Sequence, residues 1–294
     1  MALRIAYMSD VHNEFERGRG PTHPSAEWLA LEKMRKGIQG HPANGPILDD
    51  LRGENVHLMV LAGDIDFAPH AIDYADQVSL FLNVPVVSVL GNHEGYDGRD
   101  LEADIRRMRS EARLADGQVS FLENEIKVFN FPQGRLHVLG CTLWTDYELL
   151  GTPEVSMREA AAGLNDHRLM RLHGKHFAPE DALNFHLVSR LWLAAEVSRI
   201  RSDEGLDAKI LIVTHHAPHG EGGAPNYRGG ALSPAFASDL TAEIMAWRPT
   251  AWIFGHTHYS CRIDVDGIPV VAAQRGYVCS EPGAETFRPA VIEI

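Results

Sequence analysis

Five short, mostly apolar runs stand out along the chain, at 3–8, 57–62, 84–90, 209–214 and 251–254. Apolar residues follow one another within each run, without the regular polar alternation of a strand that has one face in water. Runs of this length and kind are typical of strands that are buried on both faces. The sequence therefore predicts five buried strands.

Segments with the apolar spacing of a helix lie between and after these runs, at 71–82, 100–114, 180–201 and 233–247. The last segment begins with Ser233 and Pro234, an N-cap residue followed by a proline in the first turn, where helices tolerate it. Strands that alternate with helices in this way predict a sheet covered by helices.

Other stretches predict strands outside this alternation. The segments 125–141 and 260–273 have the pattern of β-hairpins, the second of them around an Asp-Gly turn, and 290–294 predicts a final strand. Together the elements favour an α/β fold in which two sheets form a sandwich with helices outside it. We expect a single domain that spans residues 1–294.

The composition is that of a globular protein without a membrane anchor. Of the 294 residues 45% are hydrophobic, and no stretch approaches the ~20 apolar residues of a membrane span. The first apolar run leads directly into polar residues, which leaves no room for a signal peptide. Cys141, Cys261 and Cys279 include no Cys-x-x-Cys pair, which favours a reducing compartment. We expect a soluble cytoplasmic protein with no membrane partner.

The net charge of −13 argues against one class of partner. Binding to DNA or RNA depends on Lys and Arg side chains that neutralise phosphates, so we expect no binding to bulk nucleic acid. A small phosphorylated substrate remains compatible with this charge, because bound divalent cations reverse the field locally. The sequence leaves the oligomeric state open.

Each of the five apolar runs ends in residues that can bind a metal ion. These oxygen and imidazole donors are Asp10, His12, Asp64, Asn92, His215, His256 and His258. Parallel strands place their carboxyl ends along one edge of a sheet, so donors from distant parts of the chain can meet there. In the Asp-x-His and His-x-His pairs, residues two apart on an extended chain also point the same way.

The number of donors favours two metal ions over one. Seven donors are more than one tetrahedral ion needs, and with Asp64 shared each of two ions gains four protein contacts. A mixed nitrogen and oxygen set without thiolates suits transition metals. We expect two divalent ions, with Mn first and Fe, Zn, Co or Ni as the other candidates. Two ions ~3.5–4 Å apart can hold a bridging hydroxide and clamp both oxygens of an in-line displacement.

The chain resembles the calcineurin-like metallophosphoesterase superfamily in five motifs that cover nearly its whole length. They are Asp10-Val11-His12, Gly63-Asp64, Gly91-Asn92-His93-Glu94, Thr214-His215-His216 and Gly255-His256-Thr257-His258. The resemblance implies a four-layer αββα sandwich, with two mixed β-sheets flanked by helices. The ligand sets that it implies are Asp10, His12 and His258 for one ion and Asn92, His215 and His256 for the other, bridged by Asp64.

The resemblance also makes His93 the catalytic residue that assists departure of the leaving oxygen. An imidazole suits this role, since it can carry a proton near neutral pH and protonate an alkoxide. A carboxylate often orients this histidine in the family, and Glu94 and Asp66 are the two candidates here. Residues 65–68 and Leu90 lack the two arginines of serine/threonine protein phosphatases, which argues against that branch.

We therefore predict a metal-dependent phosphoric ester hydrolase. It would cleave a small phosphomonoester or phosphodiester by attack of a metal-bridging hydroxide. A cyclic-nucleotide-type phosphodiesterase is an alternative within enzymes, and a non-catalytic protein-binding scaffold of the same fold is an alternative outside them. Retention of His93 and of all seven donors favours an enzyme over a scaffold.

Three segments do not belong to the predicted sandwich. We expect a cap or lid insertion around 145–180, where 151–177 shows no clear periodicity, a substrate loop around 217–232, and a surface excursion at 13–50 with an amphipathic segment at 28–38. Candidates for substrate contact are His216, Asn165, Arg168, Tyr227 and Arg228. The alternative for His216 is a hydrogen bond that supports a metal ligand, and for the others a solvated loop.

Overall fold

The computed structural model describes residues 2–17, 46–278 and 280–294. Most of the predicted excursion at 13–50, its amphipathic segment at 28–38 and Cys279 lie outside the described residues. Within them, strands and helices alternate as predicted.

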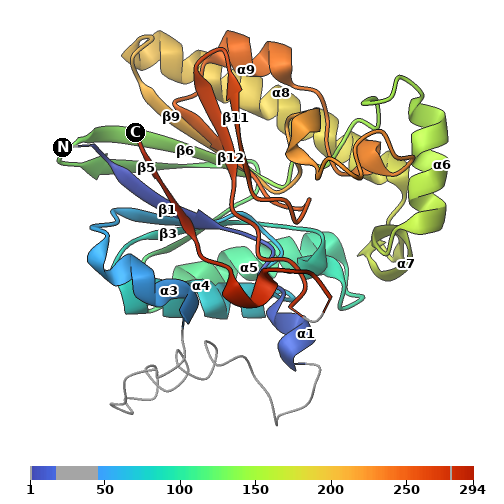
Figure 1. The fold of residues 1–294 in the computed structure, drawn as a ribbon, viewed down its shortest axis with the longest axis horizontal. Helices are drawn as coiled ribbons and strands as arrows, with labels where there is room; N and C mark the ends of the chain where they lie inside the picture. Colours follow the sequence, from blue (N-terminus) through green and yellow to red (C-terminus); the bar gives the residue numbers. More distant parts are fainter. Residues whose placement is uncertain (1, 18–45, 279) are drawn as a thin grey trace.

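The first sheet has the strand order β13-β1-β2-β3-β4 (Figure 1). Its strands are β1 (Arg4–Met8), β2 (Leu58–Leu61), β3 (Val86–Val89), β4 (Val119–Leu122) and β13 (Ala290–Glu293). Strands β1 to β4 are parallel to one another, and β13 runs antiparallel to β1. Their carboxyl ends therefore meet at one edge of the sheet, as predicted for β1, β2 and β3, whereas β4 was not predicted.

The second sheet has the order β11-β12-β10-β9-β6-β5. Its strands are β5 (Glu125–Phe131), β6 (Gly134–Cys141), β9 (Lys209–Thr214), β10 (Ala251–Ile253), β11 (Cys261–Val265) and β12 (Ile268–Ala272). The two predicted hairpins are present as β5-β6 and β11-β12, both antiparallel. Strands β6, β9, β10 and β12 are parallel to one another.

Helices cover the outer face of each sheet, so that the four layers αββα are formed (Figure 1). These helices are α3 (Pro46–Asp49), α4 (His70–Leu82) and α5 (Leu101–Leu114) on the first sheet and α8 (Pro179–Glu204) and α9 (Thr241–Trp247) on the second. Side chains of β1 alternate between two cores. Ile5 and Tyr7 pack between the sheets, while Ala6 and Met8 pack in the core that contains α4. Burial on both faces, predicted from the unbroken apolar runs, is confirmed here.

The predicted helix at 233–247 is wrong in its first half. A single 3₁₀ turn occupies Ser233–Ala235, and α9 begins only at Thr241. Between them, Ala237 forms a bridge with Ala217, and Ser238 donates its backbone N–H to the Ala217 carbonyl at 3.1 Å. These backbone groups are used between segments, so they cannot continue a helix.

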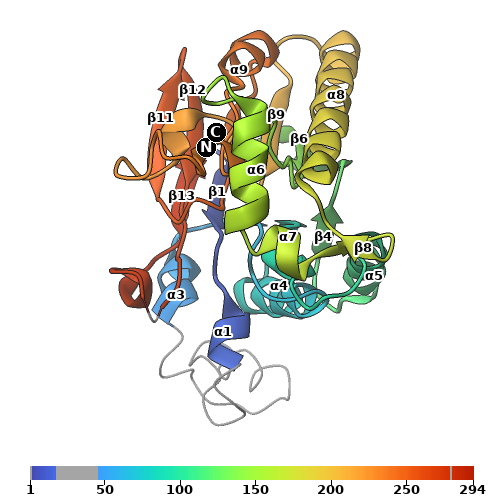
Figure 2. The same cartoon turned by 90° about the vertical axis from the view of Figure 1, so that its right-hand side faces the viewer.

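The segment from 145 to 180 contains regular structure where the sequence showed no periodicity. It forms α6 (Pro153–Gly163), α7 (Asp166–Leu169) and a small hairpin of β7 (Arg171–Leu172) and β8 (Lys175–His176). Helices α6 and α7 lie on the side of the sandwich that is remote from both termini (Figures 1 and 2). The roles of 145–180 as a cap and of 217–232 as a substrate loop stay predictions.

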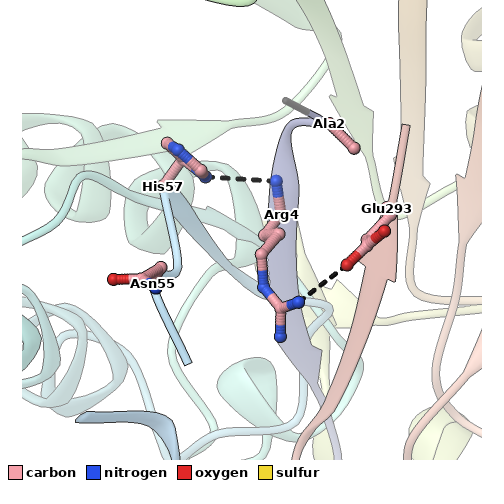
Figure 3. A pocket seen from close by; sticks show the side chains of 5 residues that line it. All are labelled: Ala2, Arg4, Asn55, His57 and Glu293. Atoms are coloured by element: carbon pink, nitrogen blue, oxygen red, sulfur yellow. Dashed lines mark hydrogen bonds and ion pairs between the residues drawn. The ribbon is translucent and has the colours of Figure 1, made fainter. Parts of the chain in front are cut away.

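A surface recess lies at the amino end of β1, lined by Ala2, Arg4, Asn55, His57 and Glu293 (Figure 3). The backbone N–H of Arg4 donates to His57 Nδ1 at 3.1 Å, and Arg4 Nη1 lies 2.7 Å from Glu293 Oε1. Arg4 is therefore held by its backbone and by one end of its guanidinium, while its buried Nε has no partner within the described residues. None of the helices in the described residues has the length and apolar character that crossing a membrane requires.

Candidate metal centre

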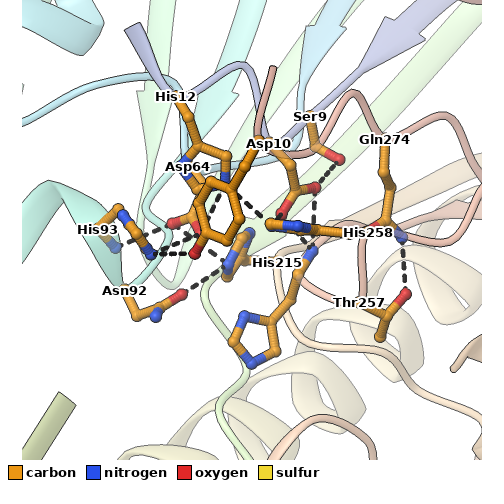
Figure 4. Close-up of polar contacts among 12 residues, drawn as sticks. Ser9, Asp10, His12, Asp64, Asn92, His93, His215, Thr257, His258 and Gln274 are labelled. Carbon is orange, nitrogen blue, oxygen red and sulfur yellow. Dashed lines mark hydrogen bonds and ion pairs between the residues drawn. The ribbon is translucent and has the colours of Figure 1, made fainter. Parts of the chain in front are cut away.

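The predicted donors lie together where β1, β2, β3, β9 and β10 end, as Figure 4 shows for most of them. Backbone hydrogen bonds join the loops that carry them. The N–H of His12 donates to the Asp64 carbonyl at 3.1 Å, and that of Gly255 donates to the His215 carbonyl at 2.9 Å. The N–H of His256 donates to Asp10 Oδ1 at 3.0 Å. Loops that are distant in sequence are thus fixed to one another.

Several donors have left-handed backbone conformations that residues other than glycine rarely adopt. They are Asp10, His12, Asp64, His256 and His258, with φ between 49° and 74°. Each conformation of this kind costs ~1–3 kcal/mol and persists only where the surroundings impose it. Such strain is concentrated at functional sites, and here it turns the side chains toward a common centre.

Two glycines allow this close packing of loops. A Cβ at Gly91 would lie 2.1 Å from Asp64 Oδ1, and one at Gly63 would lie 2.5 Å from His215 Nδ1. Gly63 also has a φ of +85°. A side chain at either position would displace a donor, which explains why glycine precedes Asp64 and Asn92.

The first cluster consists of Asp10, His12 and His258, whose ligand atoms lie within 4.8 Å of one another. His12 Nδ1 lies 3.0 Å from Glu14 Oε1, and His258 Nδ1 lies 2.7 Å from Glu281 Oε1. Since carboxylates only accept hydrogen bonds, each Nδ1 carries the proton. The two Nε2 atoms then face each other at 2.9 Å. Burial lowers the pKa of His258, but the carboxylates of Glu281 and Asp10 outweigh it and raise the pKa. The contact is therefore favourable when His258 Nε2 holds a proton or when a metal ion lies between the two nitrogens.

The second cluster consists of Asp64, His215 and His256. His215 Nδ1 donates to the Ala62 carbonyl at 2.8 Å, and its Nε2 faces two acceptors, Asn92 Oδ1 at 3.0 Å and Asp64 Oδ1 at 3.3 Å. Burial lowers the pKa of His215, but the carboxylate of Asp64 outweighs it and raises the pKa to about 9, so without an ion Nε2 holds a proton. The buried Nε2 of His256 has no hydrogen-bond partner within the described residues. A metal ion would take the place of the proton on His215.

The orientation of Asn92 is fixed by a residue that the sequence analysis missed. Asn92 Nδ2 donates to Asp166 Oδ1 at 2.9 Å and to the Tyr96 hydroxyl at 2.8 Å, which leaves Oδ1 turned toward His215. Asp166 belongs to α7 and is buried. Partners of this kind orient metal ligands in many metalloproteins. The predicted cap segment thus contributes a side chain that supports the centre.

Asp64 lies between the two clusters with one oxygen toward each. Its Oδ1 is 3.3 Å from His215 Nε2 in the second cluster, and its Oδ2 is 3.9 Å from His12 Nε2 in the first. Burial opposes the charge of Asp64, but the imidazoles of His215 and His93 hold the pKa of its carboxyl well below the usual range. A buried anion in this position is suited to bridge two cations.

The chemistry of the donors therefore fits two divalent cations. Carboxylate oxygens, imidazole lone pairs and an amide oxygen suit transition metals, and carboxylates or carbonyls hold the other nitrogen of three of the four histidines. Asp10, His12 and His258 would hold one ion and Asn92, His215 and His256 the other, with Asp64 between them. This division of the residues between two ions is the one that the resemblance implies, and it stays a prediction.

His93 lies beside the centre with one ring nitrogen directed inward. Its Nδ1 is 2.8 Å from Glu14 Oε1, while Nε2 lies 4.0 Å from Asp64 Oδ2 and 3.2 Å from the Tyr277 hydroxyl. Burial by itself lowers the pKa of His93, but the carboxylates of Asp64 and Glu14 outweigh it and raise the pKa to about 9. The ring can therefore hold a proton at neutral pH.

Within the described residues, no hydrogen bond joins His93 to Glu94 or Asp66, the two predicted carboxylates. Glu94 accepts hydrogen bonds from three backbone N–H groups of the loops after β2 and β3, at 2.8–3.1 Å, and Asp66 Oδ1 accepts from the Phe67 N–H. Glu14 holds the ring instead, and the prediction of Glu94 or Asp66 is corrected. A sequence signal for Glu14 exists, because it lies two residues after His12 and continues the alternation of acidic and imidazole groups.

His216 is buried and packs against the centre. Its ring lies 4.0 Å from the ring of His256 and 4.8 Å from that of Trp144, centroid to centroid. Its Nδ1 has no partner within the described residues. Burial, followed by the neighbouring His215, holds the pKa of His216 well below its usual value. A neutral ring pressed against His256 suits support of that side chain.

The other four candidates for substrate contact are exposed. Arg168 Nη2 donates to Asn165 Oδ1 at 2.7 Å on α7. Arg228 donates to carbonyl groups of its own loop, and the Tyr227 side chain is 73% exposed. Within the described residues none of the four is hydrogen-bonded to a donor of the two clusters. Their roles in substrate contact stay predictions.

Comparison with known proteins decides the family. The profile of the calcineurin-like phosphoesterase family matches residues 3–260. The chain belongs to this family. Calcineurin-like phosphoesterases typically depend on two metal ions, and the two clusters give this member residues suited to them.

Two other proteins place this calcineurin-like phosphoesterase among its relatives. Uncharacterized protein L509 of Acanthamoeba polyphaga mimivirus is 23% identical over 258 residues, which cover 82% of this chain and 86% of that protein. The crystal structure of the phosphopantetheinyl hydrolase from Mycobacterium tuberculosis superposes with a TM-score of 0.64 at 15% identity, covering all of this chain and 96% of the other. The second likeness shows that the fold is shared.

Proposed function

We propose that this protein hydrolyses a small phosphomonoester or phosphodiester with two divalent transition-metal ions, manganese in the first place. Water attacks phosphorus directly, and no covalent intermediate with the enzyme forms. When bound, the two ions supply positive charge for the phosphoryl oxygens and lower the pKa of the attacking water. The protein's own residues hold the ions, orient the side chains that bind them and protonate the leaving oxygen.

The observation that carries the proposal is the pair of buried clusters in which groups able to bind a metal ion converge. His12 and His258 turn their Nε2 atoms toward each other at 2.9 Å, and His215 turns its Nε2 toward Asn92 Oδ1 at 3.0 Å. A buried acceptor without a donor costs ~1–3 kcal/mol. A proton or a metal ion between these atoms removes that cost, and two ions can serve both clusters at once.

His93 supports the assignment to hydrolysis over a purely structural metal site. Glu14 holds its Nδ1, so Nε2 is presented toward Asp64 and the centre between the clusters. A protonated imidazole in that place can stabilise phosphoryl charge and give its proton to the leaving oxygen. A scaffold that only bound protein would have no use for this residue.

A small substrate agrees with the composition of the chain. Residues 65–68 and Leu90 lack the arginines that hold phosphate in serine/threonine protein phosphatases, so phosphate binding falls to the metal ions and His93. The net charge of −13 disfavours a polyanionic substrate. We therefore propose a single phosphate ester group as the feature that is recognised.

The first test is metal-dependent hydrolysis. The purified protein, loaded with Mn²⁺, is assayed with p-nitrophenyl phosphate as the monoester and bis-p-nitrophenyl phosphate as the diester. We expect close to two ions per chain by elemental analysis and hydrolysis that a chelator abolishes and Mn²⁺ restores. Full turnover after removal of all metal, or no turnover of either ester with two ions bound, would contradict the proposal. The ratio of the two rates separates a phosphatase from a phosphodiesterase.

The second test concerns His93. We expect the His93→Asn variant to keep both metal ions and to lose ~10²–10⁴ in turnover, which is the usual contribution of acid assistance. Loss of metal in parallel with activity would make His93 a ligand and remove its role as the acid. His57→Asn, a change in the recess at the other end of β1, is the matched control.

A further inference from the structure

The Tyr277 hydroxyl contacts His93 Nε2, the ring nitrogen that would protonate the leaving group. Its hydroxyl is 3.2 Å from His93 Nε2, and its ring centroid lies 4.6 Å from that of His12 and 4.5 Å from that of His258. Tyr277 is partly exposed, so it stands between the buried clusters and solvent. The family motifs do not include this residue.

The loop that carries Tyr277 is fixed to the centre from both sides. Its neighbour Gly276 donates its N–H to the Asp10 carbonyl at 3.0 Å, and Glu281 donates its N–H to the Tyr277 carbonyl at 2.9 Å. Glu281 Oε1 also lies 2.7 Å from His258 Nδ1. Gly276 has a φ of +77°, and a Cβ there would lie 2.1 Å from Glu281 Oε2, so a side chain would strain this turn and displace the Glu281 carboxylate. The packing of this loop therefore determines the position of the Tyr277 hydroxyl.

The ring of Phe15 packs beside the rings of Tyr277 and His93. Its ring stands edge-on to that of Tyr277, at a centroid distance of 5.1 Å and an angle of 88°, and lies 5.8 Å from the ring of His93. The side chain of Phe15 is 49% exposed, in contrast to the buried rings of His12 and His93. Among the residues that the structure describes, this ring therefore leaves apolar area uncovered directly beside the polar centre.

We propose that Tyr277 and Phe15 form the leaving-group subsite of this enzyme and that the preferred leaving group is a flat aromatic alcohol. The proposal rests on the proposed function. The leaving oxygen must reach His93 Nε2, and the space there is bounded by the Tyr277 hydroxyl and the two rings. A substituent on that oxygen then lies against Phe15, where an aromatic group gains edge-to-face contacts that an aliphatic one lacks.

The two residues have separate tasks in the reaction. Water oxygen forms the new bond to phosphorus, the bond from phosphorus to the ester oxygen breaks, and His93 gives its proton to that oxygen. The proton that the water releases restores His93 through solvent. Tyr277 donates a hydrogen bond to the departing oxygen and keeps its own proton throughout. Phe15 takes no part in proton transfer and contributes only contact area.

The test uses two phosphonates that cannot be hydrolysed, benzylphosphonate and cyclohexylmethylphosphonate, which are of similar size. Binding to the Mn²⁺-loaded protein is measured by calorimetry. We expect wild type to bind the aromatic ligand about three- to tenfold more tightly. Phe15→Leu should bring the ratio close to one, with metal content unchanged. Phe129→Leu, which removes a ring from β5, is the matched control and should keep the wild-type ratio.

The hydroxyl is tested separately with Tyr277→Phe, which keeps the ring. We expect the phosphonate ratio to be retained and kcat on benzyl phosphate to fall about 10- to 100-fold, as for loss of one hydrogen bond to a developing negative charge. Equal affinity of wild type for both phosphonates, or no binding of either, would overturn the aromatic subsite. An unchanged kcat in Tyr277→Phe would overturn the role of the hydroxyl.

These outcomes separate the inference from the proposed function. Hydrolysis of benzyl phosphate by a wild type that shows no aromatic preference leaves the phosphoesterase standing and removes the subsite. An aromatic preference in binding without hydrolysis removes the phosphoesterase, and the role of the Tyr277 hydroxyl falls with it.

Discussion

The two ends of β1 offer a direct comparison between a hollow and a site. At the amino end, Arg4 pairs with Glu293 at 2.7 Å and also with Glu54, and these carboxylate side chains are about half exposed. Beyond the carboxyl end, Asp10 and His12 are buried among other acceptors and have left-handed backbones. The amino end therefore has partly exposed ion pairs, whereas the carboxyl end brings together buried groups that can bind a metal ion.

This difference says which feature of a structure points to function. Exposed ion pairs such as those of Arg4 contribute ~0–1 kcal/mol and need no ligand. Buried acceptors that face one another cost stability until something positive binds, and strained backbone adds to that cost. The recess of Figure 3 is lined by partly exposed ion pairs, whereas the converging buried donors of Figure 4 point to a functional site.

The largest effect on metal binding and hydrolysis is expected from a change at Asp64. In the Asp64→Asn variant the residue loses its charge and one of the two oxygens that face the clusters, at 3.3 Å and 3.9 Å from their histidines. We expect loss of both metal ions and a fall in hydrolysis on the order of 10³-fold or more. Elemental analysis of the purified variant checks this. Retention of one ion at full occupancy would show that Asp64 belongs to a single cluster.

The donors at this end follow from the sequence for a simple physical reason. A buried apolar run must end where the strand leaves the core, so the first polar residue after it stands at the edge of the sheet. This fixed the places of Asp10, Asp64 and His215 without knowledge of the fold. Strand β4 was missed because only its four residues, Val119–Leu122, stand between the polar Gln118 and Glu123, whereas the apolar run that contains β3 extends over 84–90.

The partners that orient the donors could not be predicted in the same way. Asp166 reaches Asn92 from α7 and Glu281 reaches His258 from the final loop, and only tertiary packing fixes these distances. Glu14 was overlooked although it follows His12 by two residues, because Glu94 and Asp66 lie nearer to His93 in the motifs. Contacts between side chains on separate loops carry no periodic signal.

The next largest effect is expected at Glu14, whose Oε1 lies 2.8 Å from His93 Nδ1 and 3.0 Å from His12 Nδ1. Glu14→Gln keeps the shape but removes the charge. We expect kcat to fall about 10- to 100-fold, the usual effect of changing a residue that orients ligands. Because Glu14 raises the pKa of His93, its loss should also move the alkaline limb of the kcat profile to lower pH.

A matched variant separates this effect from general damage to the metal centre. Glu281→Gln changes the corresponding partner of His258 and leaves His93 untouched. We expect weaker metal binding in Glu281→Gln but no shift of the alkaline limb at saturating Mn²⁺. Identical pH profiles for Glu14→Gln and wild type would show that Glu14 has a structural role only.

A smaller effect concerns Glu123. It is a buried carboxylate at the same end of the sheets, and it has hydrogen-bond donors within reach. Its Oε2 accepts from the N–H and the hydroxyl of Thr142, at 2.8 Å and 2.7 Å. Burial outweighs these bonds and raises the pKa of Glu123 to about 7 from 4.5. Between these values the folded protein holds a proton that the unfolded chain releases, so the free energy of unfolding falls as the pH rises.

The Glu123→Gln variant removes this pH dependence. We expect the free energy of unfolding of the variant, relative to that of wild type, to be about 2 kcal/mol higher at pH 8 than at pH 5. Urea unfolding of both metal-free proteins at the two pH values measures the difference, and the other titrating groups cancel in it. A constant difference between the variants across this range would mean that Glu123 is ionised in the folded protein.

The smallest effect is expected from a change in the recess at the amino end of β1. Arg4→Ala removes the ion pairs with Glu293 and Glu54, whose side chains are 56% and 49% exposed. Since water already solvates these charges, we expect a loss of less than about 1 kcal/mol in the free energy of unfolding. Metal content and kcat should equal those of wild type, because no contact joins Arg4 to the donor clusters within the described residues. A large loss of turnover in this variant would mean that the two ends of β1 are coupled, and the contrast between paired and unpaired polar groups would no longer separate the site from the hollow.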